Sequence, residues 1–359
     1  MSLFDHDRSS ERVPVSLITG FLGSGKTTLL KALLRHPGMA DSAVIINEFG
    51  EVGLDHLLVE AVEGEIAVLA SGCVCCTMRS DLEETLRGLL ARRDRHEVPF
   101  FQRVLVETTG LADPAPIVQL LLNNPLLNHF VRLDAVVTTV DAVHAERQLD
   151  ANAAAVKQVA LADRLLLTKT DLAAADAIAP LRVRLARLNP GGTINTVQHG
   201  EIEPNRLFGA ALFDPERKSP DIRRWLNHEV YANNQHHHHG EHDHAHASAM
   251  HDKAIRAFCI TFELPLDWMM VSGWLGQLRR SRGEDLLRVK GILNVAGENA
   301  PVALHGVHHV FHPPVLLNAW TDDDRRSRIV FITRGLEREE VEESWRRICG
   351  AVAEDRGSR

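Results

Sequence analysis

The stretch that decides the fold spans residues 13–27 and reads VPVSLITGFLGSGKT. Its first half is an apolar run typical of a buried strand, and its second half, Gly20–Thr27, matches the pattern G-x-x-x-x-G-K-[ST]. We call Gly20–Thr27 the phosphate loop, because its glycines let backbone N–H groups turn around a phosphate while Lys26 reaches the outer phosphates and the Thr27 hydroxyl binds magnesium. Residues 28–35 continue at helical spacing, so the phosphate would also face the positive end of a helix. The stretch predicts a nucleoside triphosphate site.

Further apolar runs alternate with helical patterns after the phosphate loop. The runs expected to form strands cover residues 43–47, 66–70, 103–107, 134–140 and 164–168. This alternation predicts an α/β fold, in which helices flank a mostly parallel sheet. Ligands of such sheets bind at the carboxyl ends of the strands, and the motifs described below each follow a strand. We therefore expect these motifs to meet at one edge of the sheet.

Composition divides the chain of 359 residues into three parts. We expect a nucleotide-binding domain over residues 1–213, a His-rich flexible linker over 214–255 and a small α+β domain over 256–353. The linker includes residues 236–246, which read HHHHGEHDHAH and cannot build a core. Its imidazoles favour a weak store of metal ions, and a plain solvated linker is the alternative.

Charge and cysteine usage exclude several classes of protein. A formal net charge of -8 argues against a general nucleic-acid surface. The polar, mixed-charge N-terminal residues and the lack of a long apolar run predict a cytoplasmic protein with no membrane partner. Three of the five cysteines lie within four positions, which favours metal or thiol chemistry in a reducing compartment over disulfides.

Residues 104–110 read VLVETTG, an apolar strand that ends in an acid and is followed by glycine. In this setting Glu107 would hold the magnesium shell or orient water, and Gly110 would bring a backbone N–H to the γ-phosphate. The group that activates water is left open between Glu107 and Glu48, and a partner could add an arginine finger that stabilises the transition state.

A second motif, TKTD over residues 168–171, follows a strand late in the same domain. Asp171 would accept two hydrogen bonds from guanine that adenine cannot reciprocate, which favours GTP over ATP. Thr168 stands where many GTPases have Asn, so we expect the hydrogen bond made by the side-chain amide of that Asn to be missing.

Residues 71–76, which we call the Cys loop, read SGCVCC. Cys73, Cys75 and Cys76 would supply three thiolates to an ion such as zinc, with Glu48 or Glu51 as the fourth ligand. A thiol redox switch and inert thiols are the alternatives.

In this order, the phosphate loop, NEFGE over residues 47–51, the Cys loop, ETTG over 107–110 and TKTD over 168–171 resemble the CobW-like GTPase family, and most closely its zinc-chaperone branch. The resemblance covers essentially the whole chain, including a CobW-type C-terminal domain. It implies GTP hydrolysis coupled to delivery of a metal ion from the Cys loop to a client apo-metalloprotein. Three alternatives remain: a GTPase that inserts cobalt or iron into a metalloenzyme or a corrin pathway, an ATP-using enzyme, and a non-enzymatic metal reservoir. The oligomeric state is left open.

The expected site residues come from these motifs. Lys26 and Glu107 are the expected catalytic residues. The residues expected to bind nucleotide are Gly20, Gly23, Ser24, Gly25, Lys26, Thr27, Thr28, Gly110, Thr168, Lys169 and Asp171. Those expected to bind metal ions are Thr27, Glu48, Cys73, Cys75 and Cys76. The expected cofactors are GTP, Mg²⁺ and Zn²⁺, with Co²⁺ as an alternative ion.

Overall fold

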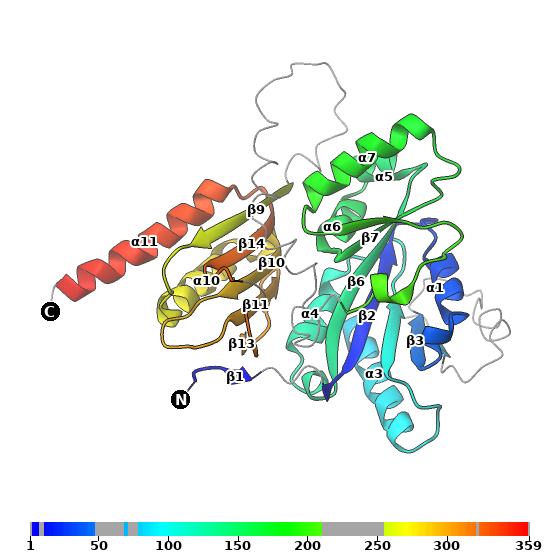
Figure 1. The fold of residues 1–359 in the computed structure, drawn as a ribbon, viewed down its shortest axis with the longest axis horizontal. Coiled ribbons are helices and arrows are strands. Elements are labelled where there is room, and N and C mark those ends of the chain that lie inside the picture. Colours follow the sequence, from blue (N-terminus) through cyan, green and yellow to red (C-terminus); the bar gives the residue numbers. More distant parts are fainter. Residues whose placement is uncertain are drawn as a thin grey trace. The chain divides into compact units, whose positions relative to one another are not determined.

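The computed structural model describes residues 2–6, 11–46, 68–70, 78–209, 255–320 and 323–357. The chain divides into two compact units, one of Ser9–Ala186 and Gly192–Ala211 and the other of Met1–Arg8, Arg187–Gly191 and Leu212–Arg359. Each unit is built on its own sheet (Figure 1). Within the described ranges, every helix is too short or too polar to span a bilayer.

The first unit contains a parallel sheet of seven strands among the described residues, in the order β4-β3-β5-β2-β6-β7-β8. The strands are β2 (Val13–Gly20), β3 (Ser42–Ile46), β4 (Val68–Ala70), β5 (Arg103–Glu107), β6 (Val131–Asp141), β7 (Arg164–Thr168) and β8 (Thr193–Thr196). Strands β3, β5 and β7 are almost wholly buried, as expected for apolar runs covered on both faces of a parallel sheet. The predicted α/β class is confirmed.

Helices flank this sheet (Figure 1). They are α1 (Lys26–Leu34), α3 (Met78–Asp94), α4 (Ala115–Asn123), α5 (Ala145–Ala151), α6 (Ala153–Leu161) and α7 (Ala175–Leu188), with single 3-10 turns at Pro37–Met39, Leu127–His129 and Pro204–Arg206. The helix after the phosphate loop packs through Leu29, Leu30 and Leu33 on a core that includes Ile18 and Leu105. The loop is thereby fixed between a buried strand and a buried helix face.

The second unit has a sheet of seven strands in the described residues, ordered β1-β13-β11-β10-β14-β9 with β12 beside β11. The strands are β1 (Asp5–His6), β9 (Ile255–Phe262), β10 (Leu286–Leu293), β11 (Val302–Val307), β12 (Val310–Phe311), β13 (Val315–Leu316) and β14 (Ser327–Arg334). All pairings are antiparallel except that of β1 with β13. Helices α10 (Trp268–Arg282) and α11 (Arg338–Gly357) and the 3-10 turn Gly283–Asp285 complete the predicted α+β domain.

One core of the second unit joins the sheet to both helices. Trp274 of α10 packs against Phe331 of β14 and Trp345 of α11, with ring centroids 6.1 and 5.2 Å away. Cys259 is buried in a smaller cluster, and burial raises the pKa of its thiol to about 11. Cys259 therefore stays a neutral core residue at physiological pH.

The first residues of the chain add a strand to the second sheet. Asp5 and His6 pair with Val315 and Leu316, although the sequence analysis grouped them with residues 1–213. Phe4 is buried in the same core, and its ring meets that of Trp268 edge to face at 4.9 Å. The second sheet thus draws residues from both ends of the sequence.

Candidate nucleotide site

The phosphate loop connects the central strand β2 to helix α1. Gly20, Gly23 and Gly25 have φ angles of 140°, 72° and 94°, which side chains disfavour. A Cβ on Gly20 would lie 2.3 Å from Thr139 Oγ1, so the loop also approaches β6 too closely for any other residue. The glycines predicted to form the cradle therefore occupy positions that require glycine.

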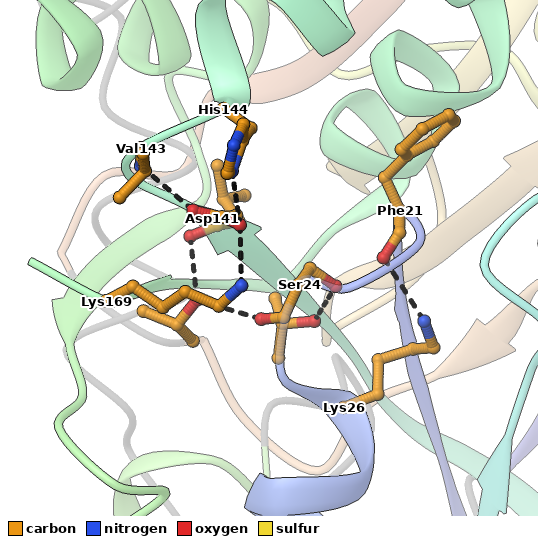
Figure 2. Close-up of polar contacts among 10 residues, drawn as sticks. Phe21, Ser24, Lys26, Asp141, Val143, His144 and Lys169 are labelled. Carbon is orange, nitrogen blue, oxygen red and sulfur yellow. Dashed lines mark hydrogen bonds and ion pairs between the residues drawn. The ribbon is translucent and has the colours of Figure 1, made fainter. Parts of the chain in front are cut away.

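Lys26 begins α1, and its ammonium turns back across the loop. Its Nζ atom donates to the carbonyl oxygen of Gly20 at 2.9 Å. It also donates to that of Phe21 at 3.3 Å (Figure 2). The Lys26 side chain is buried, so its charge acts in surroundings where water screens it little. A buried cation at this loop suits the oxygens of a phosphate chain.

Glu107 meets the phosphate loop from the neighbouring strand. Parallel pairing sets Glu107 of β5 opposite Ile18 of β2, and the Thr27 hydroxyl donates to Glu107 Oε1 at 3.0 Å. Glu107 is only 4% exposed. The two oxygens are hard donors of the kind that Mg²⁺ prefers, so the residues present fit this ion. The structure brings together the two motifs that the sequence analysis expected to share a magnesium site.

Gly110 and the residues after it pack against the phosphate loop. A Cβ on Gly110 would lie 2.7 Å from the backbone nitrogen of Leu22. Helix α6 holds this segment from the other side, because Gln158 Nε2 donates to the carbonyl oxygens of Gly110 at 3.2 Å and Ala112 at 3.0 Å. Gln158 is 1% exposed and belongs to no motif, so the sequence analysis missed it. The only sequence signal for Gln158 was the presence of a polar residue on the apolar side of a helix.

Thr168 ties the TKTD motif to the phosphate loop. Its hydroxyl lies 2.8 Å from the Ser24 carbonyl oxygen, to which it donates, and 3.3 Å from that of Val140. The Ser24 hydroxyl in turn lies 2.7 Å from Thr139 Oγ1. The side-chain amide expected of Asn at this position is absent, and the Thr168 hydroxyl makes its own hydrogen bond to the loop.

We expect Thr168→Val to lower the free energy of unfolding by about 1–2 kcal/mol, because an isosteric side chain without the hydroxyl leaves a buried carbonyl without this donor. Nucleotide affinity should fall with it, as the loop loses its tie. Urea unfolding and nucleotide titration measure the two effects. Thr168→Ser keeps the hydroxyl and is the matched control; equal losses in both variants would show that the methyl group matters and the hydrogen bond does not.

Lys169 and Asp171 follow β7 at the same sheet edge. Lys169 has a left-handed backbone, with φ of 55°, and its Nζ atom lies 2.8 Å from Asp141 Oδ2 (Figure 2). Burial raises the pKa of Asp141, but hydrogen bonds from Lys169, His144 and the Val143 N–H outweigh it and leave the pKa below its usual value. Asp171 is exposed and available to a ligand. Asp141 is a second residue that sequence reasoning missed.

The expected metal ligands apart from Thr27 lie outside the described residues. These are Glu48, Cys73, Cys75 and Cys76, and the alternative ligand Glu51 and the His-rich run 236–246 also lie there. In the part of the chain that the structure describes, no cluster of three or more His, Cys, Asp or Glu side chains is arranged to hold a metal ion. The zinc site remains a prediction.

Comparisons with known proteins agree with this geometry. Residues 14–196 match the family model of the CobW/HypB/UreG nucleotide-binding domain, and residues 255–349 match that of the cobalamin synthesis protein cobW C-terminal domain. The zinc chaperone YjiA of Escherichia coli K12 is 35% identical over 92% of this chain and 96% of its own length. The zinc chaperone CobW of Pseudomonas aeruginosa is 30% identical over 91% of this chain and 88% of its own.

One further relative extends the comparison to a eukaryote, and a crystal structure of YjiA extends it to the fold. Zinc-regulated GTPase metalloprotein activator 1 of Schizosaccharomyces pombe is 29% identical over 94% of this chain and 86% of its own length. The crystal structure of Zn(II)-bound YjiA GTPase from E. coli has a TM-score of 0.69 at 32% identity, covering 94% of this chain and 99% of that one. The family expected from the motifs is confirmed: the chain belongs to the CobW/HypB/UreG family of P-loop GTPases and has a CobW C-terminal domain.

Proposed function

We propose that this chain is a GTP-hydrolysing metallochaperone that binds zinc at the Cys loop and transfers it to a client apo-metalloprotein. The observation that carries the proposal is the parallel strand order β4-β3-β5-β2. Carboxyl ends of parallel strands share one edge of a sheet. Strand β4 ends at Ala70, three residues before Cys73, and β2 ends at Gly20, where the phosphate loop begins. The two strands are three spacings apart, about 14 Å, which is close enough for one segment to contact both sites.

The nucleotide half of the proposal is supported by the described contacts. The Lys26 ammonium, which lies on the Gly20 carbonyl of the loop, would donate to the phosphate oxygens, and Thr27 and Glu107 would hold Mg²⁺, which when bound neutralises charge on the phosphates. Gly110 packs against Leu22 of the phosphate loop and would offer its N–H to the γ-phosphate, and the exposed Asp171 would accept from guanine. Glu107 is one candidate for orienting the attacking water, and Glu48 is the other.

Strand β3 supports a link between the nucleotide and the metal. It lies between β4 and β5 and ends at Ile46, directly before the segment 47–53 that contains Glu48. We propose that the γ-phosphate and magnesium hold this segment and the Cys loop in one arrangement, and that hydrolysis relaxes both. By linkage, zinc must then change the affinity for GTP by the same factor as GTP changes the affinity for zinc. Relatives named as zinc chaperones and as a zinc-regulated GTPase metalloprotein activator fit such coupling.

A zinc titration in the presence of a nonhydrolysable GTP analogue and of GDP tests this proposal. We expect the dissociation constants to differ by about fivefold or more, as is typical of allosteric coupling. The Cys73/Cys75/Cys76 triple serine variant should lose the tightly bound zinc, whereas Cys349→Ser, which removes a thiol of α11, should retain it. Identical constants with both nucleotides would refute the coupling, and unchanged zinc content in the triple variant would refute the site. Preference for Co²⁺ or Fe²⁺ over Zn²⁺ would favour the insertion alternative, and failure to release phosphate with metal and client present would favour the reservoir.

A further inference from the structure

Residues 109–112, which we call the Gly110 turn, follow β5 and form a tight turn beside the phosphate loop. The Ala112 N–H donates to the Thr109 carbonyl oxygen at 3.1 Å, which closes a β-turn with Gly110 as its second residue. The C=O and N–H of a planar trans peptide point in opposite directions, so the Thr109 carbonyl that faces into the turn directs the Gly110 N–H out of it. Gly110 itself lies against Leu22 of the phosphate loop, so this N–H leaves the turn close to the proposed phosphate site.

Gln158 of α6 fixes the peptide on the other side of Gly110. Its Nε2 atom uses both protons, donating to the carbonyl oxygens of Gly110 at 3.2 Å and Ala112 at 3.0 Å. Together with the turn hydrogen bond, these contacts fix the orientation of the peptides before and after Gly110. Gln158 Oε1 is buried and has no hydrogen-bond partner among the described residues. Since an unpaired buried oxygen lowers stability, the contribution of this amide is its donor group.

Helix α6 gives Gln158 a rigid support. The Thr138 hydroxyl of β6 donates to the Gln158 backbone carbonyl at 2.9 Å, and both residues are 1% exposed. The preceding residue, Lys157, pairs with Asp113 directly after the Gly110 turn. A side chain positions a functional group best when it is itself locked by packing and by hydrogen bonds around it. Gln158 meets that condition, because it is buried on a helix that is bonded to the sheet.

We propose that Gln158 is a positioning residue for GTP hydrolysis, which holds the Gly110 turn in the shape that lets the Gly110 N–H meet the γ-phosphate. The inference rests on the contact between Gly110 and the γ-phosphate proposed above. A donor that is already in place stabilises the charge developing on the phosphate without further reorganisation. GDP has no γ-phosphate, so Gln158 should affect the binding and turnover of GTP but not the binding of GDP.

Gln158→Met tests the inference, because methionine keeps the length of the side chain and has no donor. We expect the dissociation constant of a nonhydrolysable GTP analogue to rise about fivefold, the loss of about one hydrogen bond, while that of GDP stays within about twofold of the wild-type value. Single-turnover hydrolysis of saturating GTP should slow by about tenfold or more, as expected when a donor is misplaced. Gln158→Asn keeps an amide that is one methylene too short to reach both carbonyls, so it should show the same losses.

Two control variants separate positioning from stability. Ser16→Ala removes a buried hydrogen bond to Asp134 at 3.1 Å, so it should lower the free energy of unfolding without changing the ratio of the two dissociation constants. Gln102→Met removes an exposed amide donor to Asp41 at 3.0 Å and should change neither quantity. Equal losses of analogue and GDP affinity in both Gln158 variants would overturn the inference, as would affinities and rates within about twofold of the wild-type values.

Gly110→Ala distinguishes failure of this inference from failure of the contact on which it rests. A Cβ there would lie 2.7 Å from the Leu22 backbone nitrogen, so the turn must move away from the phosphate loop. If Gly110→Ala raises the dissociation constant of the analogue and the Gln158 variants do not, the contact stands and the role of Gln158 is refuted. If none of these variants raises it, Gly110 does not bind the γ-phosphate and the inference fails with that contact. The titrations contain neither zinc nor a client protein, so the metallochaperone proposal is tested separately.

Discussion

Replacing Lys26 by alanine is expected to lower kcat/KM for GTP hydrolysis by about 1,000-fold, the upper range for removing one group that stabilises developing charge in a water-poor site. The Lys26 ammonium is buried and held at the mouth of the phosphate loop by the carbonyls of Gly20 and Phe21. The core contacts of α1 are made by Leu29, Leu30 and Leu33 and remain in this variant, so the fold should be retained. Phosphate release at several GTP concentrations gives kcat and KM, and circular dichroism checks the fold.

Lys31→Ala is the control for this variant, because Lys31 lies more than one turn further along the same helix. It should hydrolyse GTP at a rate close to that of the wild-type protein. If Lys26→Ala kept kcat/KM within tenfold of the wild-type value, the Gly20–Thr27 stretch would not be the site of phosphate chemistry.

Glu107→Gln is expected to lower kcat by about 100-fold or more while the affinity for GTP changes little, in line with the loss of a group that handles a proton or a water molecule. The amide keeps the shape of the side chain and still accepts from the Thr27 hydroxyl, 3.0 Å away in the wild-type protein, but has no charge for a magnesium shell. The variant should therefore also need more Mg²⁺ for half-maximal rate. Single-turnover hydrolysis across a Mg²⁺ series measures both effects.

Glu97→Gln, on the exposed turn after α3, removes an equal charge away from the site and should leave the rate unchanged. The informative comparison is with Glu48→Gln. If Glu107→Gln turned over normally and Glu48→Gln did not, Glu48 rather than Glu107 would be the residue that orients the attacking water.

The strands and motifs of the first unit were predictable because each is marked by a pattern of residues close together in the sequence. Buried parallel strands read as continuous apolar runs, such as 103–107, and the phosphate loop requires glycines at fixed spacing. Strands β8 and β1 gave no such signal. Strand β8 reads TINT and is only half buried, and β1 has two residues whose strand character depends on β13, some 310 positions away in sequence.

The residues that join the motifs were harder to predict than the motifs themselves. Asp141 and Gln158 act through contacts between β6, β7, α6 and the loop after β5, and none of these contacts leaves a spacing pattern in the sequence. Thr168 shows the opposite difficulty. Comparison with the usual Asn indicated only that an amide is absent, and only the structure shows that the Thr168 hydroxyl bonds the Ser24 carbonyl oxygen.

Strand β1 affects both the design of shortened versions of the chain and the order in which the second sheet forms. Because Phe4 and Asp5–His6 complete the second sheet, a polypeptide that starts at the His-rich run would leave the edge of β13 and the ring of Trp268 uncovered. Bare strand edges invite pairing with other chains. Residues 4–6 can reach their place in the sheet only after Trp268 and residues 315–316 have been synthesised, so β1 joins the second sheet late in folding.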